Sequence, residues 1–188
     1  MSRASLAPSV PPDRAAVAAR VAELMREVPD YPEPGILFRD ITPVLADAQA
    51  FADLVAVMAA AAPGPVDLVA GMESRGFLLA APVAVALGAG LVPVRKAGKL
   101  PGPTLSETYE LEYGTATLEL HPFTVPAGAR VLVLDDVLAT GGTAAATLRL
   151  FADCGAEVVG ISVLAELAGL RGRDQVEGVP VDALLTLP

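Results

Sequence analysis

The sequence predicts an α/β protein built on a parallel five-stranded sheet flanked by helices. Five apolar segments of strand length alternate with segments of helical character: residues 66–71, 88–96, 129–136, 157–167 and 181–187. Near-continuous apolar strands separated by helices are typical of a parallel sheet covered on both faces. The chain has 188 residues, 53% of them hydrophobic. That size and composition suit one domain with a sizeable core.

The first third of the chain is expected to hold a tail, two helices and a loop. Residues 1–12 are broken by three prolines and predict a disordered tail, which leaves 13–188 as a single domain. Asp13 can cap a helix that ends before Pro29 and carries four apolar residues on one face, Val17, Val21, Leu24 and Val28. Residues 29–36 predict a proline-rich loop, and a second amphipathic helix is expected from Phe51 to about Ala62.

The remaining elements follow in alternation. Strand 66–71 leads through the turn "GMESRG" into an apolar helix that ends at Leu87. Strand 88–96 is followed by a loop over 98–107 and by a hairpin, "TYELEYGTATLELH", that turns near Gly114. Strand 129–136 precedes a helix from Gly142 to Cys154, and the last two strands complete the sheet. Ligands of parallel sheets bind at the carboxyl ends of strands, so turns 71–76, 95–99, 135–143 and 165–167 are expected to carry function.

Charge and composition exclude several function classes. The formal net charge is −9, which argues against general nucleic-acid binding because phosphate contacts need a basic surface. The sequence contains no run of about 18 large apolar residues, so it predicts no membrane-spanning helix. The N-terminus has no apolar signal-peptide region. The single cysteine, Cys154, cannot form an internal disulfide; it is expected to be a small buried helix residue and fits a reducing cytoplasm.

The only two lysines, Lys96 and Lys99, stand close together in "VRKAGKLPGP". They form either a local cationic site for an anionic ligand or a chance pair in a chain that favours arginine. Charge alone leaves both interpretations open.

The stretch "VLVLDDVLATGGT" combines a phosphate-binding turn with two carboxylates. Gly141 and Gly142 allow close backbone approach, the following helix presents free N–H groups, and Thr140 and Thr143 add hydroxyls. Neither a Walker A loop nor a dinucleotide fingerprint is present. Asp135 and Asp136, expected outside the core at a strand end, can accept hydrogen bonds from two vicinal hydroxyls. A ribose 5-phosphate supplies both groups, and a magnesium ion on its hydroxyls would offset the carboxylate charge.

This stretch resembles the phosphoribosyl pyrophosphate signature of the type I phosphoribosyltransferases. From about residue 14 to about residue 173 the chain is similar to the adenine phosphoribosyltransferases, with no departure noticed at a position that the family uses for chemistry. The matching segments are "PGILFRDITPVL", "GMESRGFLLA", "VRKAGKLPGPTLSETYELEYGT" and "VLVLDDVLATGGT". The resemblance implies the family's fold, with a small hood and a flexible hairpin lid, and a homodimer.

The resemblance also implies roles for individual residues. Arg75, Arg95 and Lys99 would bind pyrophosphate, and residues 139–143, Ala139 included, would bind the 5-phosphate. Phe38 would stack on a purine with Leu167 on the opposite face, while backbone groups near Leu37 and Arg39 would distinguish adenine. Magnesium would enter with the donor, near Asp135 and Asp136, without direct protein ligands. A non-proline cis peptide bond is implied between Glu73 and Ser74.

The implied reaction joins adenine to phosphoribosyl pyrophosphate and gives AMP and pyrophosphate, a step of purine salvage. Its transition state would resemble an oxocarbenium ion, which water would capture in an open site. The proline- and glycine-rich stretch 99–112 is the expected lid, and Glu112 would move in with it as a catalytic residue beside Arg75. Two alternatives stay open: a transferase for another purine such as xanthine, and a regulator that senses phosphoribosyl pyrophosphate without turnover.

Overall fold

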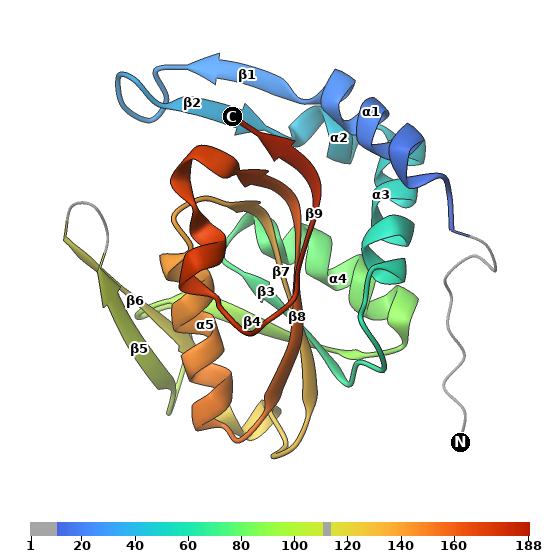
Figure 1. The fold of residues 1–188 in the computed structure, drawn as a ribbon. Helices are drawn as coiled ribbons and strands as arrows, with labels where there is room; N and C mark the ends of the chain where they lie inside the picture. Colours follow the sequence, from blue (N-terminus) through green and yellow to red (C-terminus); the bar gives the residue numbers. More distant parts are fainter. Residues whose placement is uncertain (1–10, 111–113) are drawn as a thin grey trace.

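A seven-stranded sheet forms the centre of the molecule (Figure 1). The computed structural model describes residues 11–110 and 114–188. Strand order is β5-β6-β4-β3-β7-β8-β9, and the five strands from β4 to β9 in this order are parallel. These are β4 (Gly90–Lys96), β3 (Leu68–Met72), β7 (Arg130–Leu138), β8 (Glu157–Leu167) and β9 (Val181–Leu187). The predicted parallel five-stranded sheet is therefore confirmed.

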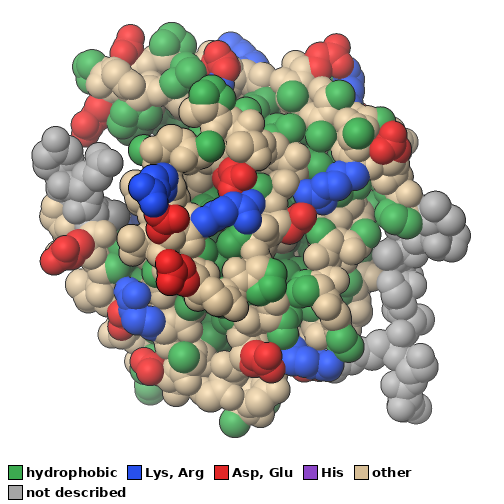
Figure 2. Space-filling model, in the orientation of Figure 1, with side chains coloured by type: hydrophobic (Ala, Val, Ile, Leu, Met, Phe, Trp, Pro, Cys, Tyr) green, Lys and Arg blue, Asp and Glu red, His purple; other side chains and the backbone are tan. Residues whose placement is uncertain are grey.

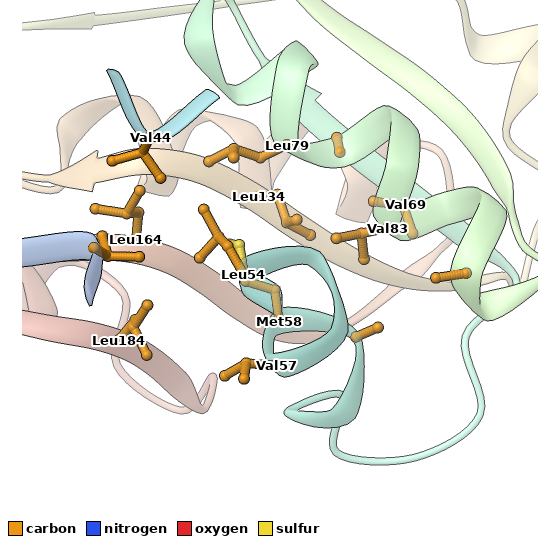
Figure 3. Packing of buried hydrophobic residues seen from close by; sticks show 14 of the residues in the cluster. Val44, Leu54, Val57, Met58, Val69, Leu79, Val83, Leu134, Leu164 and Leu184 are labelled. Atoms are coloured by element: carbon orange, nitrogen blue, oxygen red, sulfur yellow. The ribbon is translucent and has the colours of Figure 1, made fainter. Parts of the chain in front are cut away.

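Alternating side chains along the strands supply the two faces of this sheet. Leu132 and Leu134 of β7 join one core cluster with α3 (Ala48–Ala60) and α4 (Arg75–Leu87). Val131 and Val133 point the other way and join a second cluster with α5 (Gly142–Asp153). Figure 3 shows the first cluster, where Leu54 and Met58 of α3 meet Leu134 and Leu164 of the sheet. Because helices cover both faces, only the strand ends remain available for a ligand.

An antiparallel hairpin extends the sheet beyond β4. Strands β5 (Leu105–Glu110) and β6 (Thr115–Leu120) pair along their full length, and β6 pairs with β4 at Arg95 and Lys96. The hairpin was predicted, but its first strand begins earlier than expected. Residues 105–107 were expected in the loop 98–107, whereas they pair with β6 because Leu105 can pack on the second core cluster.

A two-stranded sheet forms a hood at the end of the molecule where the C-terminal residue lies (Figure 1). Helix α1 (Arg14–Leu24) begins at its predicted cap, Asp13, but Val28 does not extend it. Val28 lies in β1 (Arg26–Pro29) and pairs with Phe38 of β2 (Leu37–Asp40). The helix prediction was wrong at this end because the edge of β2 takes residues 26–29 as its partner strand.

Several other boundaries also differ from the prediction; β3 spans Leu68–Met72 instead of 66–71, and β4 begins at Gly90 instead of residue 88. A short helix, α2 (Thr42–Ala46), precedes α3, and α3 begins at Ala48 rather than Phe51 because the Asp47 side chain accepts from Ala50 N at 2.9 Å. Strand β7 continues past Asp136 to Leu138. Cys154 is half-buried and caps the end of α5 instead of lying buried within it. The remaining short elements are 3-10 turns: η1 (Pro122–Thr124), η2 (Ala168–Leu170) and η3 (Gly172–Gln175).

Candidate active site

Two adjoining hollows lie at the carboxyl ends of the parallel strands. The larger has a volume of about 380 Å³ and lies between the hood and the ends of β3, β7 and β8. Its lining joins segments far apart in the sequence: residues 36–39, 73–75, 135–137, Ala139 and Leu167. The smaller, about 80 Å³, is lined by residues 137–144 with Met72, Asp135 and Val163. Three of the four turns chosen from the sequence therefore meet in these two hollows.

Apolar side chains line the end of the larger hollow that faces the hood. Leu37, Phe38 and Leu167, the residues assigned to a purine, all line it. Tyr31 supports Phe38 from outside the hollow with an edge contact, the two ring centroids being 5.1 Å apart. Ile36 also lines this end and is 46% exposed, although no role was predicted for it. Its place in "PGILFRD", beside Leu37, was the signal that could have identified it.

Arg75 connects this apolar end to the acidic pair. Its guanidinium carbon lies 4.6 Å from the centre of the Phe38 ring. Nη1 donates to the Arg39 carbonyl at 3.2 Å, and Nη2 lies 2.8 Å from Asp136 Oδ2. The sequence grouped Arg75 with Arg95 and Lys99, whereas the structure directs it toward the acidic pair and the hood.

The acidic pair is more deeply buried than a strand end suggests. Asp136 is only 4% exposed, so the expectation that both carboxylates lie outside the core was wrong for it. The reason is that β7 runs on to Leu138 and α4 packs across it. Asp135 Oδ1 accepts from the Asp136 backbone N–H at 2.9 Å. Burial and then the negative charge of Asp136 raise the pKa of Asp135 well above its usual value. The single charge of Arg75 therefore does not offset both carboxylates.

Residues 139–143, which the sequence predicts as a phosphate cradle, form the turn that leads from β7 into α5. Gly141 precedes α5 with φ of +86°, a conformation that favours glycine. Thr140, Gly141, Gly142 and Thr143 all line the smaller hollow, and α5 directs its free N–H groups there.

The two glycines of the cradle serve different close contacts. A Cβ atom on Gly141 would lie 2.3 Å from the Gly172 carbonyl oxygen, so the cradle backbone packs directly on η3. A Cβ atom on Gly142 would lie 3.2 Å from the Tyr109 ring. The lack of a side chain at Gly142 was expected to let a phosphate come close to the backbone. It also lets the Tyr109 ring of the hairpin come close. Nothing in the sequence pointed to Gly172.

The two predicted cations of β4 and its following turn converge on one carboxylate, that of Glu73. Lys99 Nζ donates to Glu73 Oε1 at 2.9 Å, and Arg95 Nε donates to Oε2 at 3.3 Å. The Lys96 backbone N–H also donates to Oε2, at 2.9 Å. Burial opposes ionisation of this carboxyl, but the three donors prevail and lower the pKa of Glu73. The sequence identified the cations but missed Glu73 as their partner.

The other predicted features are the peptide bond between Glu73 and Ser74, the lid with Glu112, and the N-terminal tail. The peptide bond between Glu73 and Ser74 is cis, as the resemblance implied. Glu112 and the lid's last residues lie outside the described part of the chain, so the role of Glu112 stays a prediction. Most of the expected N-terminal tail lies outside it as well. Among residues 11–110 and 114–188, no three His, Cys, Asp or Glu side chains gather in a group that could hold a metal ion.

Charged side chains of both signs are interleaved on the face seen in Figure 2. This face carries no broad basic area, in keeping with the net charge of −9. None of the helices in the described residues is long and apolar enough to cross a membrane.

Comparisons with known proteins agree with this geometry. Residues 42–183 match the family described as "Phosphoribosyl transferase domain". The chain is 59% identical over 167 residues to an adenine phosphoribosyltransferase of Clavibacter michiganensis, a match covering 89% of this chain and 95% of that protein. The crystal structure of an adenine phosphoribosyltransferase from Thermoanaerobacter pseudethanolicus is similar with a TM-score of 0.88 and 48% identity, covering 90% of this chain and 99% of that one. The Saccharomyces cerevisiae enzyme, solved with adenine and an imino-altritol bisphosphate, gives a TM-score of 0.85 at 39% identity over 91% and 99% of the two chains.

Proposed function

The chain belongs to the adenine phosphoribosyltransferase family, and from this premise we propose how its site carries out the reaction. The enzyme transfers the phosphoribosyl group of phosphoribosyl pyrophosphate to adenine and gives AMP and pyrophosphate. It is a pentosyltransferase of purine salvage.

One observation supports this function above the others: a single hollow of about 380 Å³ is apolar at one end and acidic at the other. The apolar end, with Phe38 and Leu167, suits a flat purine ring. The acidic end, with Asp135 and Asp136, suits the 2- and 3-hydroxyls of a ribose because ionised carboxylates accept hydrogen bonds. The cradle beyond it, over residues 139–143, receives the 5-phosphate.

The pyrophosphate of the donor is bound by Arg95 and Lys99. Both side chains contact Glu73, which lines the larger hollow together with the acidic pair. Guanidinium and ammonium groups suit phosphate oxygens, and both side chains already hold an anion, the Glu73 carboxylate. Pyrophosphate therefore shares or replaces that carboxylate as their partner. Arg75 lies between this group and the base, where its charge offsets that of Asp136.

Magnesium is the cofactor we propose, and it fits the residues present. Asp136 Oδ2 is buried and accepts no hydrogen bond, and its close contact with Arg75 is an ion pair. Asp135 beside it resists ionisation. A magnesium ion that enters with the donor would bring positive charge to this pair and would neutralise part of the donor's charge. Arg95 and Lys99 hold the rest of the pyrophosphate, and Asp135 and Asp136 orient the sugar.

In the chemical step, a purine nitrogen forms a bond to C1 of the ribose and releases its N–H proton, while the bond from C1 to pyrophosphate breaks and pyrophosphate leaves with the bonding electrons. Stacking between Phe38 and Leu167 holds the base in line with C1, and the carboxylates hold the sugar ring. Positive charge that develops on the ribose is favoured by the acidic pair next to it. Closure of the stretch 99–112, with Glu112, would exclude water from that cation.

We also propose that the enzyme is a homodimer and works in the cytoplasm. One face of α4 presents Leu78, Ala81, Pro82 and Val85, of which Leu78 is 50% and Val85 is 60% exposed. An apolar helix face of this kind is typical of an interface. Phe77 lies beside it and under Arg95, whose guanidinium carbon is 5.9 Å from the ring centre, so the interface would adjoin the pyrophosphate site. The single cysteine suits the cytoplasm.

An isotope assay tests the function directly. Labelled adenine, hypoxanthine, guanine and xanthine are each offered with phosphoribosyl pyrophosphate and magnesium, and the labelled nucleotide is counted. We expect AMP alone to accumulate at a high rate. Preference for xanthine would assign the protein to another base, and donor binding without any nucleotide formed would make it a sensor instead.

A further inference from the structure

The hairpin touches the phosphate cradle through one side chain, that of Tyr109 in β5. The hydroxyl oxygens of Tyr109 and Thr143 lie 2.9 Å apart, and Thr143 belongs to the first turn of α5. The Tyr109 ring lies against Gly142, where an added Cβ atom would come within 3.2 Å of it. Thr143 lines the smaller hollow, whereas Tyr109 is not part of its lining. Tyr109 therefore reaches Thr143 from behind the cradle.

Other contacts hold the hairpin together, and one holds it against α5, without Tyr109. Arg149 of α5 forms an ion pair with Glu107 of β5, and the Thr108 and Thr117 hydroxyls lie 2.8 Å apart across the two strands. The strands also pair through their backbones over residues 105–110 and 115–120. The Tyr109 hydroxyl is thus not needed to keep the hairpin in place.

The Thr143 hydroxyl has one proton and two acceptor sites. A phosphate dianion only accepts hydrogen bonds, so Thr143 serves it only by donating that single proton. If Thr143 donates to Tyr109 instead, the phosphate loses a donor. If Tyr109 donates to Thr143, the proton of Thr143 is free to point into the cradle. Thr147 does not compete, because its hydroxyl donates to the Thr143 backbone carbonyl at 2.9 Å.

We propose that Tyr109 is a positioning residue for the 5-phosphate: its hydroxyl donates to Thr143 and directs the Thr143 proton toward the ligand. The proposal rests on the proposed function of the cradle. Chains of hydroxyls polarise one another, so each bond in the series Tyr109, Thr143, phosphate strengthens the next. Ligands that carry a 5-phosphate depend on Tyr109, and adenine does not.

The test is the variant Tyr109→Phe, which keeps the ring against Gly142 and removes only the hydroxyl. Calorimetry with ribose 5-phosphate and with AMP should show binding weakened about tenfold, the range for a hydrogen bond that serves a charged group. The KM for phosphoribosyl pyrophosphate should rise by a similar factor, while the KM for adenine stays at the parent value. A merely structural role would change both KM values together.

A double-mutant cycle with Thr143→Val identifies the route of the effect. If Tyr109 acts through Thr143, the double variant should bind ribose 5-phosphate no more weakly than Thr143→Val alone. Thr117→Val is the matched control, since it also removes one hydroxyl-to-hydroxyl bond from the hairpin but lies away from the cradle. It should bind ribose 5-phosphate as the parent does.

Three results would overturn the proposal: parent-like ribose 5-phosphate binding by Tyr109→Phe, additive losses in the cycle, or an equal loss in Thr117→Val. Each of these leaves the proposed function intact, because the parent still binds the sugar phosphate. Failure of the parent itself to bind ribose 5-phosphate would instead overturn the assigned cradle and, with it, this inference.

Discussion

At the scale of single residues, Asp135 carries a conflict between stability and binding. Its carboxylate is half-buried beside Asp136, and this burial and then the charge of Asp136 raise the pKa of Asp135. The folded state then binds a proton more tightly than the unfolded state does. Stability from this group is therefore present at low pH and is lost as pH rises from about 3.8 through the raised value. The same charge is what a ribose hydroxyl needs as an acceptor.

The variant Asp135→Asn should separate these two effects. Asn keeps an oxygen that can accept from Asp136 N–H, so the backbone contact at 2.9 Å survives. The melting temperature of the variant should exceed that of the parent, by a margin that grows between about pH 4 and about pH 7. Binding of ribose 5-phosphate should weaken, because a lost charge-assisted hydrogen bond costs about 1.5–3 kcal/mol.

Thermal melts across this pH range and calorimetry check both halves. Asp53→Asn is the control: it makes the same change on α3, where Oδ1 accepts from Gln49 at 3.0 Å. Its melting temperature should follow that of the parent at every pH. A destabilised Asp135→Asn at neutral pH would show that its charge is not a cost to the fold.

The residues of the site were largely visible in the sequence, and their partners were not. Asp135 and Asp136 lie near the end of β7 and the cradle follows that strand, so a local pattern is enough to find them. The Thr143 contact with Tyr109 joins residues 34 apart, and Glu73 meets Lys99 across 26 residues. Such pairs depend on strand order and register, which local patterns do not contain.

At the scale of elements, the cradle depends on its contact with η3. A Cβ atom on Gly172 would lie 2.2 Å from the Ala139 carbonyl oxygen, whereas one on Gly169 would meet nothing within 4 Å. Gly172→Ala should therefore push the cradle backbone away, with a loss of stability of about 1–3 kcal/mol, typical of overpacking. Binding of AMP should weaken with it, because the cradle N–H groups lose their alignment.

Gly169→Ala makes the same chemical change three residues earlier and should match the parent in both measurements. Melting temperatures and AMP titrations of the two variants give the comparison. Equal behaviour of Gly172→Ala and Gly169→Ala would mean that η3 yields without disturbing the cradle.

Element boundaries were predictable where the apolar pattern alone decides them. Strands 157–167 and 181–187 have the predicted bounds, since each is a compact apolar run that pairs in the parallel sheet. The prediction for Val28 was wrong because its spacing also fits the helix, and only pairing with Phe38 places it in a strand. The short helix Thr42–Ala46 was missed because five residues are too few for a periodic pattern.

At the scale of the whole molecule, the proposed homodimer predicts that the exposed face of α4 is its interface. The double variant Leu78→Asp with Val85→Asp puts two charges on the face that the proposed homodimer would bury. We expect a dimeric parent and a monomeric variant in sedimentation, because an unpaired buried charge strongly opposes association.

Phe123→Asp is the control, since Phe123 is 77% exposed and lies on η1 instead of α4. It should sediment as the parent does. A monomeric parent would contradict the homodimer, and a dimeric double variant would place the interface on another face.

The contact between Lys99 and Glu73 also determines which side chains are suitable for attaching this enzyme to a support or a dye. Lys96 and Lys99 hold its only side-chain amines, and Lys99 faces Glu73 within the site. Coupling through lysine, to a bead or a dye, would therefore block the end of the site that we propose for pyrophosphate. The single thiol is a better attachment point, because Cys154 lies at the far end of the 12-residue helix α5, about 18 Å along its axis from the cradle. Burial and then the charge of Asp153 raise the pKa of that thiol, so labelling needs a more alkaline buffer than usual.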